Sequence, residues 1–409
     1  MKFENLKMRE EFETIGLLYD DFEEEPHSAV LKYNKNGAVV SYSIDQPFIE
    51  TVNTQNQQFF ITSNGERIVL LNGYLTNKIE HSAGILTLEY FFQYMLVNVT
   101  SGNMDCELKK FEKFEMNCSY FKDILQKSPF KISSKKDNRF SSNIKAEFKK
   151  IIDFSFNYNN NEIHVVDNVK AKQSSFKDNK DISFDSTPFI KVNYEQEISF
   201  SELLEEISKV KYLFSFLLDM KIVVNELIVK TNGNKFKMFW SNESEINIGL
   251  GNMLKKDKAK ELIENHFENI FKNYYLDHRF RDIFETFINN MYKPTYVDDY
   301  LVSQLIIIEG LDTRFRDKGR RINIKTRIEK FIEFFDESDL EEVLKYYKIN
   351  IDFNEEFIKK LSDFRNYHAH LFEIERKAEL PVDKYILAKV LRKLIRKYLL
   401  VKLLDNEQN

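Results

Sequence analysis

The spacing of hydrophobic residues changes near residue 250 from every second position to every third or fourth, and this change most restricts how the chain can fold. Glycine follows the same division, because nine of the 11 glycines lie at or before Gly251 and only Gly310 and Gly319 follow. A period of two is typical of strands, whereas a period of about 3.6 is typical of helices. We therefore expect a two-domain α+β protein, with a β-rich domain over residues 1–246 and an all-helical domain over residues 247–409.

Four Asn-Gly pairs in the first half suit the positive φ angles of tight hairpin turns. These pairs are Asn36-Gly37, Asn64-Gly65, Asn72-Gly73 and Asn232-Gly233. Alternating segments flank three of the pairs and predict strands over 30–33, 38–44, 59–62, 67–71, 225–230 and 235–240. Apolar residues at helical spacing predict one helix over 199–220. The β-rich domain is therefore expected to be a sandwich-like or bent sheet with attached helices.

The second half shows successive apolar stripes at helical spacing, so an all-helical bundle of five to seven helices is expected. The predicted helices cover 262–271, 280–291, 297–311, 324–335, 340–347 and 357–372, and a last one is opened by Pro381. The segment 297–311 has hardly any polar face, so it should lie at the centre of the bundle.

Composition excludes several classes of protein. The 60 Lys and Arg residues face 65 Asp and Glu residues, so contact with nucleic acid must come from a local patch and not from net charge. Only Cys106 and Cys118 are present, which suits a reducing compartment. The N-terminal residues do not resemble a secretion signal, and there is no apolar run long enough to span a membrane. A cytoplasmic protein without membrane contact is expected.

Known nucleotide and metal motifs are absent from the sequence, including GxxxxGK[ST], GxGxxG, HExxH and GxSxG. No group of residues has metal-ligand spacing, so neither a metal nor another cofactor is expected. Of seven histidines, only His368 and His370 stand close together, in the segment Arg365-Asn366-Tyr367-His368-Ala369-His370.

The residue types in this segment suit RNA cleavage. A histidine can move a proton to or from a ribose hydroxyl near neutral pH, and an arginine can stabilise charge on a phosphate. Asn366 and His370 share a helix face, whereas Arg365 and His370 diverge by about 140°. His368 falls on the apolar stripe and is interpreted as a packing or interface residue. By themselves, one arginine and one histidine on a helix are more typical of a solvated surface than of a catalytic site.

The same segment resembles the Arg-polar-x-x-x-His motif of HEPN ribonucleases, which are all-helical domains named for higher eukaryotes and prokaryotes nucleotide-binding. The helix that ends with Ile306-Ile307-Ile308-Glu309-Gly310-Leu311 is similar to an earlier helix of that family, which implies that Glu309 is a salt-bridge partner of Arg365. A β-rich half followed by this type of helical half resembles the ApeA-like anti-phage proteins.

The resemblance implies a metal-independent endoribonuclease that works as a homodimer, with the motif helices of two chains lining one composite cleft. His370 would act on the 2′-hydroxyl or the leaving oxygen, Arg365 would stabilise the transition state, and Asn366 would hold the geometry. In this family such activity serves growth arrest, as a toxin or in abortive infection, through cleavage of tRNA or other cellular RNA. The N-terminal domain would sense a phage-derived trigger or restrain the nuclease.

Local clusters of cations offer separate support for an RNA substrate. The stretch from Arg314 to Lys330 contains only two acids, Asp317 and Glu329. Candidate RNA-binding residues in this stretch and on the last helix are Arg314, Arg316, Arg320, Arg321, Lys325, Arg392 and Arg396. A basic helix face is equally typical of a solvated surface.

Two other classes of function fit the sequence. The helical domain could be a non-catalytic HEPN module that only dimerises or binds RNA or protein. Alternatively, the chain could assist a separate nucleotidyl-transfer enzyme. Strand scission by the purified protein distinguishes the ribonuclease from both.

Overall fold

The computed structural model describes most of the chain. Its described residues are 6–8, 10–20, 25–34, 36–45, 54–81, 85–99, 108, 110–125, 130–134, 142–146, 150–175, 182–240, 253–292, 296–316, 322–370 and 379–405. Within these ranges, the side chains of 130–134, 142–146, 171–175, 182–185, 253–256, 291–292 and 369–370 are not described. Contacts divide the chain into a first unit, Met1–Lys211 with Ile222–Glu264, and a second unit, Tyr212–Lys221 with Asn265–Asn409.

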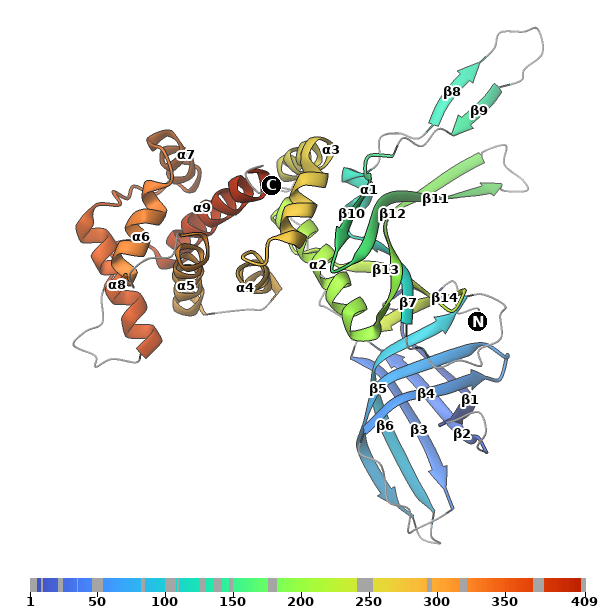
Figure 1. Ribbon diagram of the computed structural model, residues 1–409. Coiled ribbons are helices and arrows are strands. Elements are labelled where there is room, and N and C mark those ends of the chain that lie inside the picture. The colour runs from blue at the N-terminus through green and yellow to red at the C-terminus, as the bar shows by residue number, and fades with distance from the viewer. Residues whose placement is uncertain are drawn as a thin grey trace. The chain divides into compact units, whose positions relative to one another are not determined.

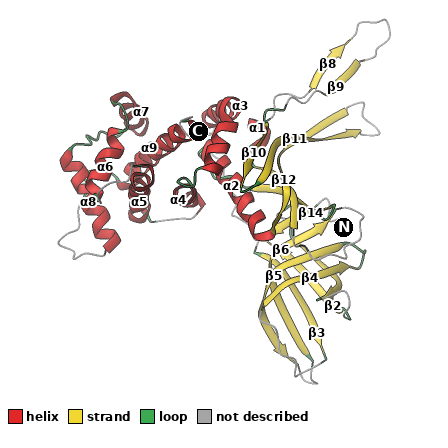
Figure 2. Cartoon of the chain, viewed as in Figure 1, coloured by secondary structure: helices red, strands yellow, loops and turns green. Residues whose placement is uncertain are grey.

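The first unit is built on one antiparallel sheet, shown in yellow in Figure 2. Its strands are β1 (Phe12–Tyr19), β2 (His27–Asn34), β3 (Gly37–Ile44), β4 (Thr54–Thr62), β5 (Arg67–Glu80), β6 (Leu86–Asn98), β7 (Lys110–Cys118), β10 (Asp153–Tyr158), β11 (Asn161–Ser175), β12 (Ile182–Ser199), β13 (Val224–Thr231) and β14 (Asn234–Trp240). The hairpin of β8 (Phe130–Ser134) and β9 (Ser142–Ala146) pairs separately, and the short helix α1 (Phe121–Ile124) follows β7.

Six of these strands close into a barrel. The order β6-β3-β2-β1-β4-β5 returns to its start because β5 also pairs with β6. Along its other edge, β6 pairs with β3 over Leu86–Phe92 and with β14 over Tyr94–Asn98. The sheet therefore leaves the barrel at β6 and continues through β14, β13, β7, β12, β11 and β10 (Figure 1). The β-rich fold class is confirmed, and the strands form a barrel with extra strands.

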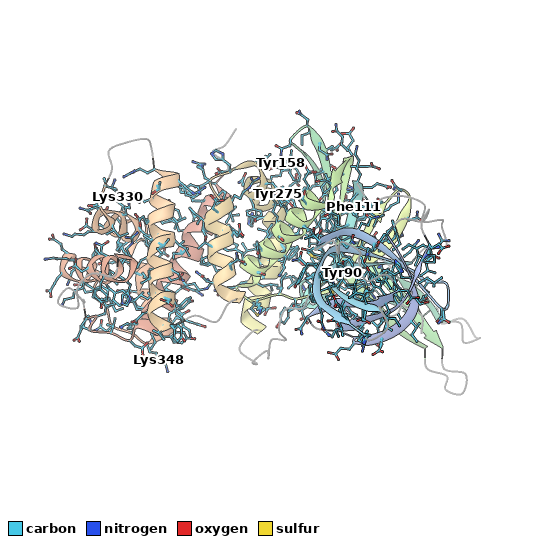
Figure 3. All side chains as sticks on the ribbon, turned by 90° about the horizontal axis from the view of Figure 1, so that it is seen from below. Tyr90, Phe111, Tyr158, Tyr275, Lys330 and Lys348 are labelled. Atoms are coloured by element: carbon cyan, nitrogen blue, oxygen red, sulfur yellow. The ribbon has the colours of Figure 1, made fainter. Side chains whose placement is uncertain are left out.

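The barrel is filled by large aromatic side chains. Tyr33, Phe60, Tyr90 and Phe92 are each at most 2% exposed. Figure 3 shows the strands curving around side chains that include Tyr90. The Tyr33 hydroxyl donates a hydrogen bond to the backbone oxygen of Met8 at 2.8 Å, so this buried polar group is satisfied. Burial of so many aromatic side chains accounts for the high aromatic content of the sequence.

The predicted hairpins are confirmed for three of the four Asn-Gly pairs. Residues around Gly37, Gly65 and Gly233 connect β2 to β3, β4 to β5 and β13 to β14, and all three glycines have positive φ angles. The turn predicted at Asn72-Gly73 was wrong, because both residues lie inside β5. Gly73 instead allows a close approach: a Cβ atom there would lie 2.4 Å from Cε1 of Phe92.

Substitution of Gly73 by alanine should destabilise the barrel by about 1–3 kcal/mol, because the buried Phe92 ring has to move. Gly310→Ala is the control, since its Cβ would meet Ile283 at an ordinary 3.4 Å within a helix. That substitution should leave stability unchanged or raise it by up to about 1 kcal/mol. Denaturant unfolding followed by circular dichroism measures both, and equal midpoints for the two variants would contradict the steric argument.

The remaining helices are shown in red in Figure 2. They are α2 (Phe200–Leu218), α3 (Met253–Leu276), α4 (Arg281–Tyr292), α5 (Val297–Phe315), α6 (Ile324–Glu333), α7 (Glu337–Tyr347), α8 (Glu355–His370) and α9 (Lys384–Leu404). The segment predicted to be central forms α5, which packs against α4, α6, α8 and α9. The last helix begins at Lys384 and not at Pro381, because the Asp383 side chain accepts a hydrogen bond from the Ile386 amide and caps it.

The C-terminal half of α2 belongs to the helical unit, although the sequence pattern groups it with the β-rich half. The ring of Phe216 lies 4.7 Å from that of Phe284 and 6.0 Å from that of Phe287. The Phe214 ring lies 5.3 Å from that of Phe267. The helical unit therefore takes part of its core from a segment that precedes β13. The domain boundary between residues 246 and 247 stays a prediction, since it lies outside the described residues.

Of the two cysteines, the structure describes Cys118, which is 2% exposed, and burial raises the pKa of its thiol. Cys106 lies outside the described residues. In the part of the chain that the structure describes, none of the helices combines the length and the apolar character needed to cross a membrane.

Candidate active site

Arg365 lies on α8, where this helix packs against α5 and α6. Leu361 and Phe364 on the same helix are fully buried, so they fix the rotation of α8 and the direction in which Arg365 projects. The Arg365 side chain is 16% exposed. A guanidinium group this far from water needs partners of opposite charge or hydrogen-bond acceptors.

Glu309 on α5 supplies that partner. Nη2 of Arg365 donates to Oε2 of Glu309 at 2.5 Å, and the Glu309 side chain is 29% exposed. Nη1 of Arg365 donates a longer hydrogen bond, 3.4 Å, to Oδ1 of Asn366. The structure thus brings together three residues singled out in the sequence, in the pairing of Glu309 with Arg365 that the resemblance implies.

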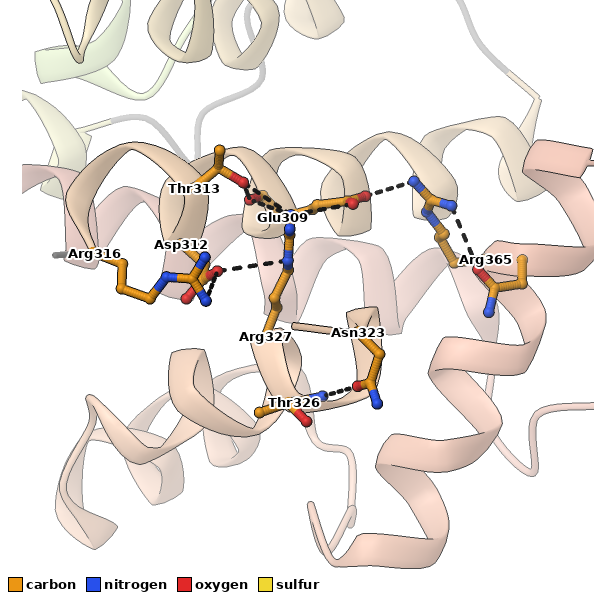
Figure 4. A network of polar contacts seen from close by, with 9 residues as sticks. Glu309, Asp312, Thr313, Arg316, Asn323, Thr326, Arg327 and Arg365 are labelled. Atoms are coloured by element: carbon orange, nitrogen blue, oxygen red, sulfur yellow. Dashed lines mark hydrogen bonds and ion pairs between the residues drawn. The ribbon is translucent and has the colours of Figure 1, made fainter. Parts of the chain in front are cut away.

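The Glu309 carboxylate is shared with a second arginine (Figure 4). Nη1 of Arg327 on α6 donates to Oε1 of Glu309 at 3.1 Å, to the Glu309 backbone oxygen at 3.3 Å and to Oγ1 of Thr313 at 2.8 Å. Asp312 lies 3.5 Å from Nε of Arg327 and 3.5 Å from Nη1 of Arg316. The five charged residues form a row of alternating sign, which we call the charge ladder: Arg365, Glu309, Arg327, Asp312 and Arg316.

The charge ladder contains three guanidinium groups and two carboxylates, so it carries one surplus positive charge. Arg327 and Asp312 are its most buried members, with side chains 12% and 8% exposed. Because charges in such positions are screened little by water, the orientation of each group strongly affects its neighbours. The surplus positive charge suits a site that binds an anion, such as a phosphate group.

His370 is the last residue of α8, and its side chain lies outside the described residues. Its backbone position is five residues after Arg365 and four after Asn366, so the helix turns it about 140° from the arginine. That Arg365 and His370 line one cleft therefore stays a prediction.

Among the described residues, no group of three or more His, Cys, Asp and Glu side chains could hold a metal ion. The acids nearest to Arg365 and Arg327 are instead paired with guanidinium groups.

Comparison with protein families matches both parts of the chain. The family model described as ApeA N-terminal domain 1 matches residues 13–280. This chain belongs to the ApeA family. A second model, described as Apea-like HEPN, matches residues 279–407 and includes Glu309, Arg327 and Arg365. No curated protein and no solved structure matches the chain. Membership places the protein among the HEPN nuclease-type anti-phage proteins, and HEPN domains generally dimerise and act on RNA.

Within this ApeA-like HEPN domain, most described cations of the basic stretch are paired with acids. Arg314 forms an ion pair with Asp282, and Arg316 lies 3.5 Å from Asp312. Lys325 donates to Glu355 at 2.5 Å, a hydrogen bond that raises the pKa of the lysine. Arg320 and Arg321 lie outside the described residues. The stretch has less surplus charge than its sequence suggests, and its contact with RNA stays a prediction.

Arg392 and Arg396 of α9, the other two candidate RNA-binding residues, donate to backbone carbonyl oxygens of the helical unit. Nη1 of Arg392 donates to the Phe287 backbone oxygen at 3.0 Å. Arg396 donates to the backbone oxygens of Phe216 at 3.1 Å and Leu217 at 2.9 Å, where α2 ends. Carbonyl groups in the last turn of a helix have no partner within that helix, so Arg396 satisfies two of those at the end of α2. Burial lowers the pKa of Arg396.

His368 packs between other residues of the HEPN domain. Its ring lies 4.4 Å from the ring of Phe364, and its side chain is 20% exposed. Nε2 lies 3.7 Å from Oδ2 of Asp298, whose other oxygen accepts a 2.7 Å hydrogen bond from Lys384. These contacts join α8 to the first turns of α5 and α9.

Two members of this site, Asp312 and Thr313, were not singled out in the sequence, and neither was the contact of Arg327 with Glu309. Glu309, Asp312 and Thr313 are three and four residues apart, so they share one face of α5. That spacing is a signal that could have identified Asp312 and Thr313. Arg327 was visible only as one of many cations, because its partners come from another helix.

Proposed function

We propose that this ApeA-family protein is a metal-independent endoribonuclease that acts in abortive infection by cleaving cellular RNA, with tRNA as one candidate target. The observation that best supports this role is the position of Arg365. Its partly buried guanidinium group is fixed by Glu309 within a site of surplus positive charge, on the helix that ends at His370. This is the arrangement that a phosphate-cleaving site requires.

In the proposed reaction, the ribose 2′-oxygen attacks the adjacent phosphorus and the 5′-oxygen leaves. A base takes the 2′-hydroxyl proton, and an acid returns a proton to the leaving oxygen, so that the products are a 2′,3′-cyclic phosphate and a free 5′-hydroxyl. His370 is assigned to this proton transfer, since imidazole titrates near neutral pH. Arg365 stabilises the negative charge that develops on the phosphate oxygens, and Asn366 helps to hold the arginine.

Two chains complete the site in this proposal. The positions of Arg365 and His370 are about 140° apart around one helix, so one phosphate is more easily reached by an arginine and a histidine from different chains. A homodimer formed by the helical domain would place them in one cleft.

The proposed contacts to the RNA backbone come from the basic stretch, namely from Arg314, Arg316, Arg320, Arg321 and Lys325. The β-rich domain is proposed to receive a phage-derived trigger.

Purified full-length protein should cut RNA in the presence of EDTA, because no step needs a metal ion. The measurement uses end-labelled RNA and identifies a 2′,3′-cyclic phosphate at the new 3′ end by its sensitivity to acid and phosphatase. Activity that is lost in EDTA and restored by Mg²⁺ would exclude the metal-independent reaction. Binding of RNA without scission between about pH 6 and 8 would leave the non-catalytic binding module as the better reading.

A further inference from the structure

Arg327 on α6 is held by contacts at both Nη1 and Nε of its guanidinium group. Its side chain is 12% exposed, and its Nη1 atom contacts the side chain of Glu309, the backbone of Glu309 and the hydroxyl of Thr313. On its other side, Nε lies 3.5 Å from Oδ2 of Asp312. Asp312 and Thr313 lie about one turn after Glu309 on α5, so Arg327 attaches α6 to the face of α5 that carries Glu309 (Figure 4).

The two oxygens of Glu309 face different arginines. Oε1 accepts from Arg327 at 3.1 Å, and Oε2 accepts from Arg365 at 2.5 Å. A carboxylate with one arginine on each oxygen has a fixed plane, whereas a carboxylate with a single arginine can rotate and take a two-oxygen, fork-like geometry. Arg327 therefore determines which oxygen of Glu309 meets Arg365 and from which direction.

Charge gives Arg327 a second effect on Arg365. Glu309 divides its negative charge between two guanidinium groups, and Asp312 holds Arg327 in place from the far side. Removal of the Arg327 charge would leave two carboxylates against two guanidinium groups, so the surplus positive charge of the ladder would be lost. Arg365 would then face the full charge of Glu309 and would stabilise a phosphate less.

We propose that Arg327 is a positioning residue for Arg365 that acts through Glu309. This inference rests on the proposed ribonuclease activity and deepens it. Arg327 itself does not touch the RNA: it fixes the Glu309 carboxylate, and the carboxylate fixes the arginine that meets the phosphate.

The test measures RNA cleavage by full-length Arg327→Met and Arg327→Lys. Arg327→Met should lower kcat about 10- to 100-fold, since a misplaced catalytic group loses mainly the chemical step, and KM should change less than about twofold. Arg327→Lys keeps the charge but not the fork, so its kcat should lie between those of Arg327→Met and the wild type. Lys345→Met, which removes an exposed cation of α7 outside the stretch from Arg314 to Lys330, is the control and should keep the wild-type kcat.

A double-mutant cycle with Glu309→Gln shows whether Arg327 acts through Glu309. In the Glu309→Gln background, replacement of Arg327 should lower kcat less than about twofold further, because the carboxylate it positions is already gone. Multiplicative losses in the double variant would overturn the proposal, as would a wild-type kcat for Arg327→Met. If circular dichroism shows that Arg327→Met does not fold, the same double-mutant cycle is measured with Arg327→Lys. That cycle then decides whether Arg327 acts through Glu309. If the wild type itself does not cut RNA, the proposed function fails, which is a different outcome from unchanged cleavage by the Arg327 variants.

Discussion

Arg365→Ala is expected to lower the rate of RNA cleavage by about 100- to 1,000-fold, because the main group that stabilises charge on the phosphate would be removed. His370→Ala should lower it by about 100- to 10,000-fold through the loss of proton transfer. Both variants should keep their fold. After the loss of Arg365, Glu309 still accepts from Arg327, so no buried carboxylate is left without a cation.

Lys359→Ala is the matched control for Arg365→Ala, since Lys359 is an exposed cation on the same helix. Cleavage of end-labelled RNA and growth of cells that express each variant are measured together. The proposal requires that Lys359→Ala cut RNA and arrest growth as the wild type does, whereas the other two do neither. Wild-type cleavage by both Arg365→Ala and His370→Ala would end the assignment of this site.

The growth assay also separates enzyme from binding module. A module that only binds RNA or dimerises would lose function through changes in affinity or assembly, and His370→Ala would then reduce growth arrest only as far as it reduced binding. Measurement of RNA affinity and oligomeric state for the same variants resolves the two cases. Loss of cleavage with unchanged affinity and unchanged oligomeric state is the result expected of a catalytic histidine.

Phe216→Ala should destabilise the helical unit by about 3–5 kcal/mol. The side chain is fully buried, its ring lies 4.7 Å from that of Phe284, and the guanidinium of Arg396 lies 5.5 Å from its centre. Truncation would leave a cavity in the core and remove this cation–π contact. Leu276→Ala removes a side chain that is 54% exposed and serves as the control, with an expected change within about 0.5 kcal/mol.

Denaturant unfolding followed by near-ultraviolet circular dichroism measures both changes. The result bears on the domain division, because Phe216 belongs to α2 and precedes the last two strands of the β-rich domain. A fragment of residues 247–409 lacks α2 and should be less stable than the same residues in the full chain. Equal stability of Phe216→Ala and Leu276→Ala would show that the helical unit does not depend on this segment.

Several structural features could be predicted from local sequence patterns. Hairpins at Gly37, Gly65 and Gly233 follow from the dipeptide that tolerates positive φ angles. The central position of α5 follows from its nearly continuous apolar surface. The pairing of Glu309 with Arg365 followed from resemblance to a family, and not from spacing, since 56 residues separate the two.

Other features could not be read from local patterns. The Asn72-Gly73 pair is the same dipeptide as in the true turns, but it lies inside β5, where Gly73 leaves room for the ring of Phe92. Closure of the barrel depends on the pairing of β1 with β4 and of β5 with β6, which no single segment determines. Arg392 and Arg396 have the spacing of a solvated helix face, but their acceptors are carbonyls in α4 and α2.

The sequence by itself determined the division into β-rich and helical halves and the positions of most elements, including the helix that carries Arg365, Asn366 and His370. Those properties depend on periodicity and on residues close together in the chain. Only the tertiary structure decided that Arg327 shares Glu309 with Arg365 and that α2 contributes to the helical core. Ion pairs and core contacts form between side chains whose separation in space is set by packing, and a distance along the sequence does not specify it.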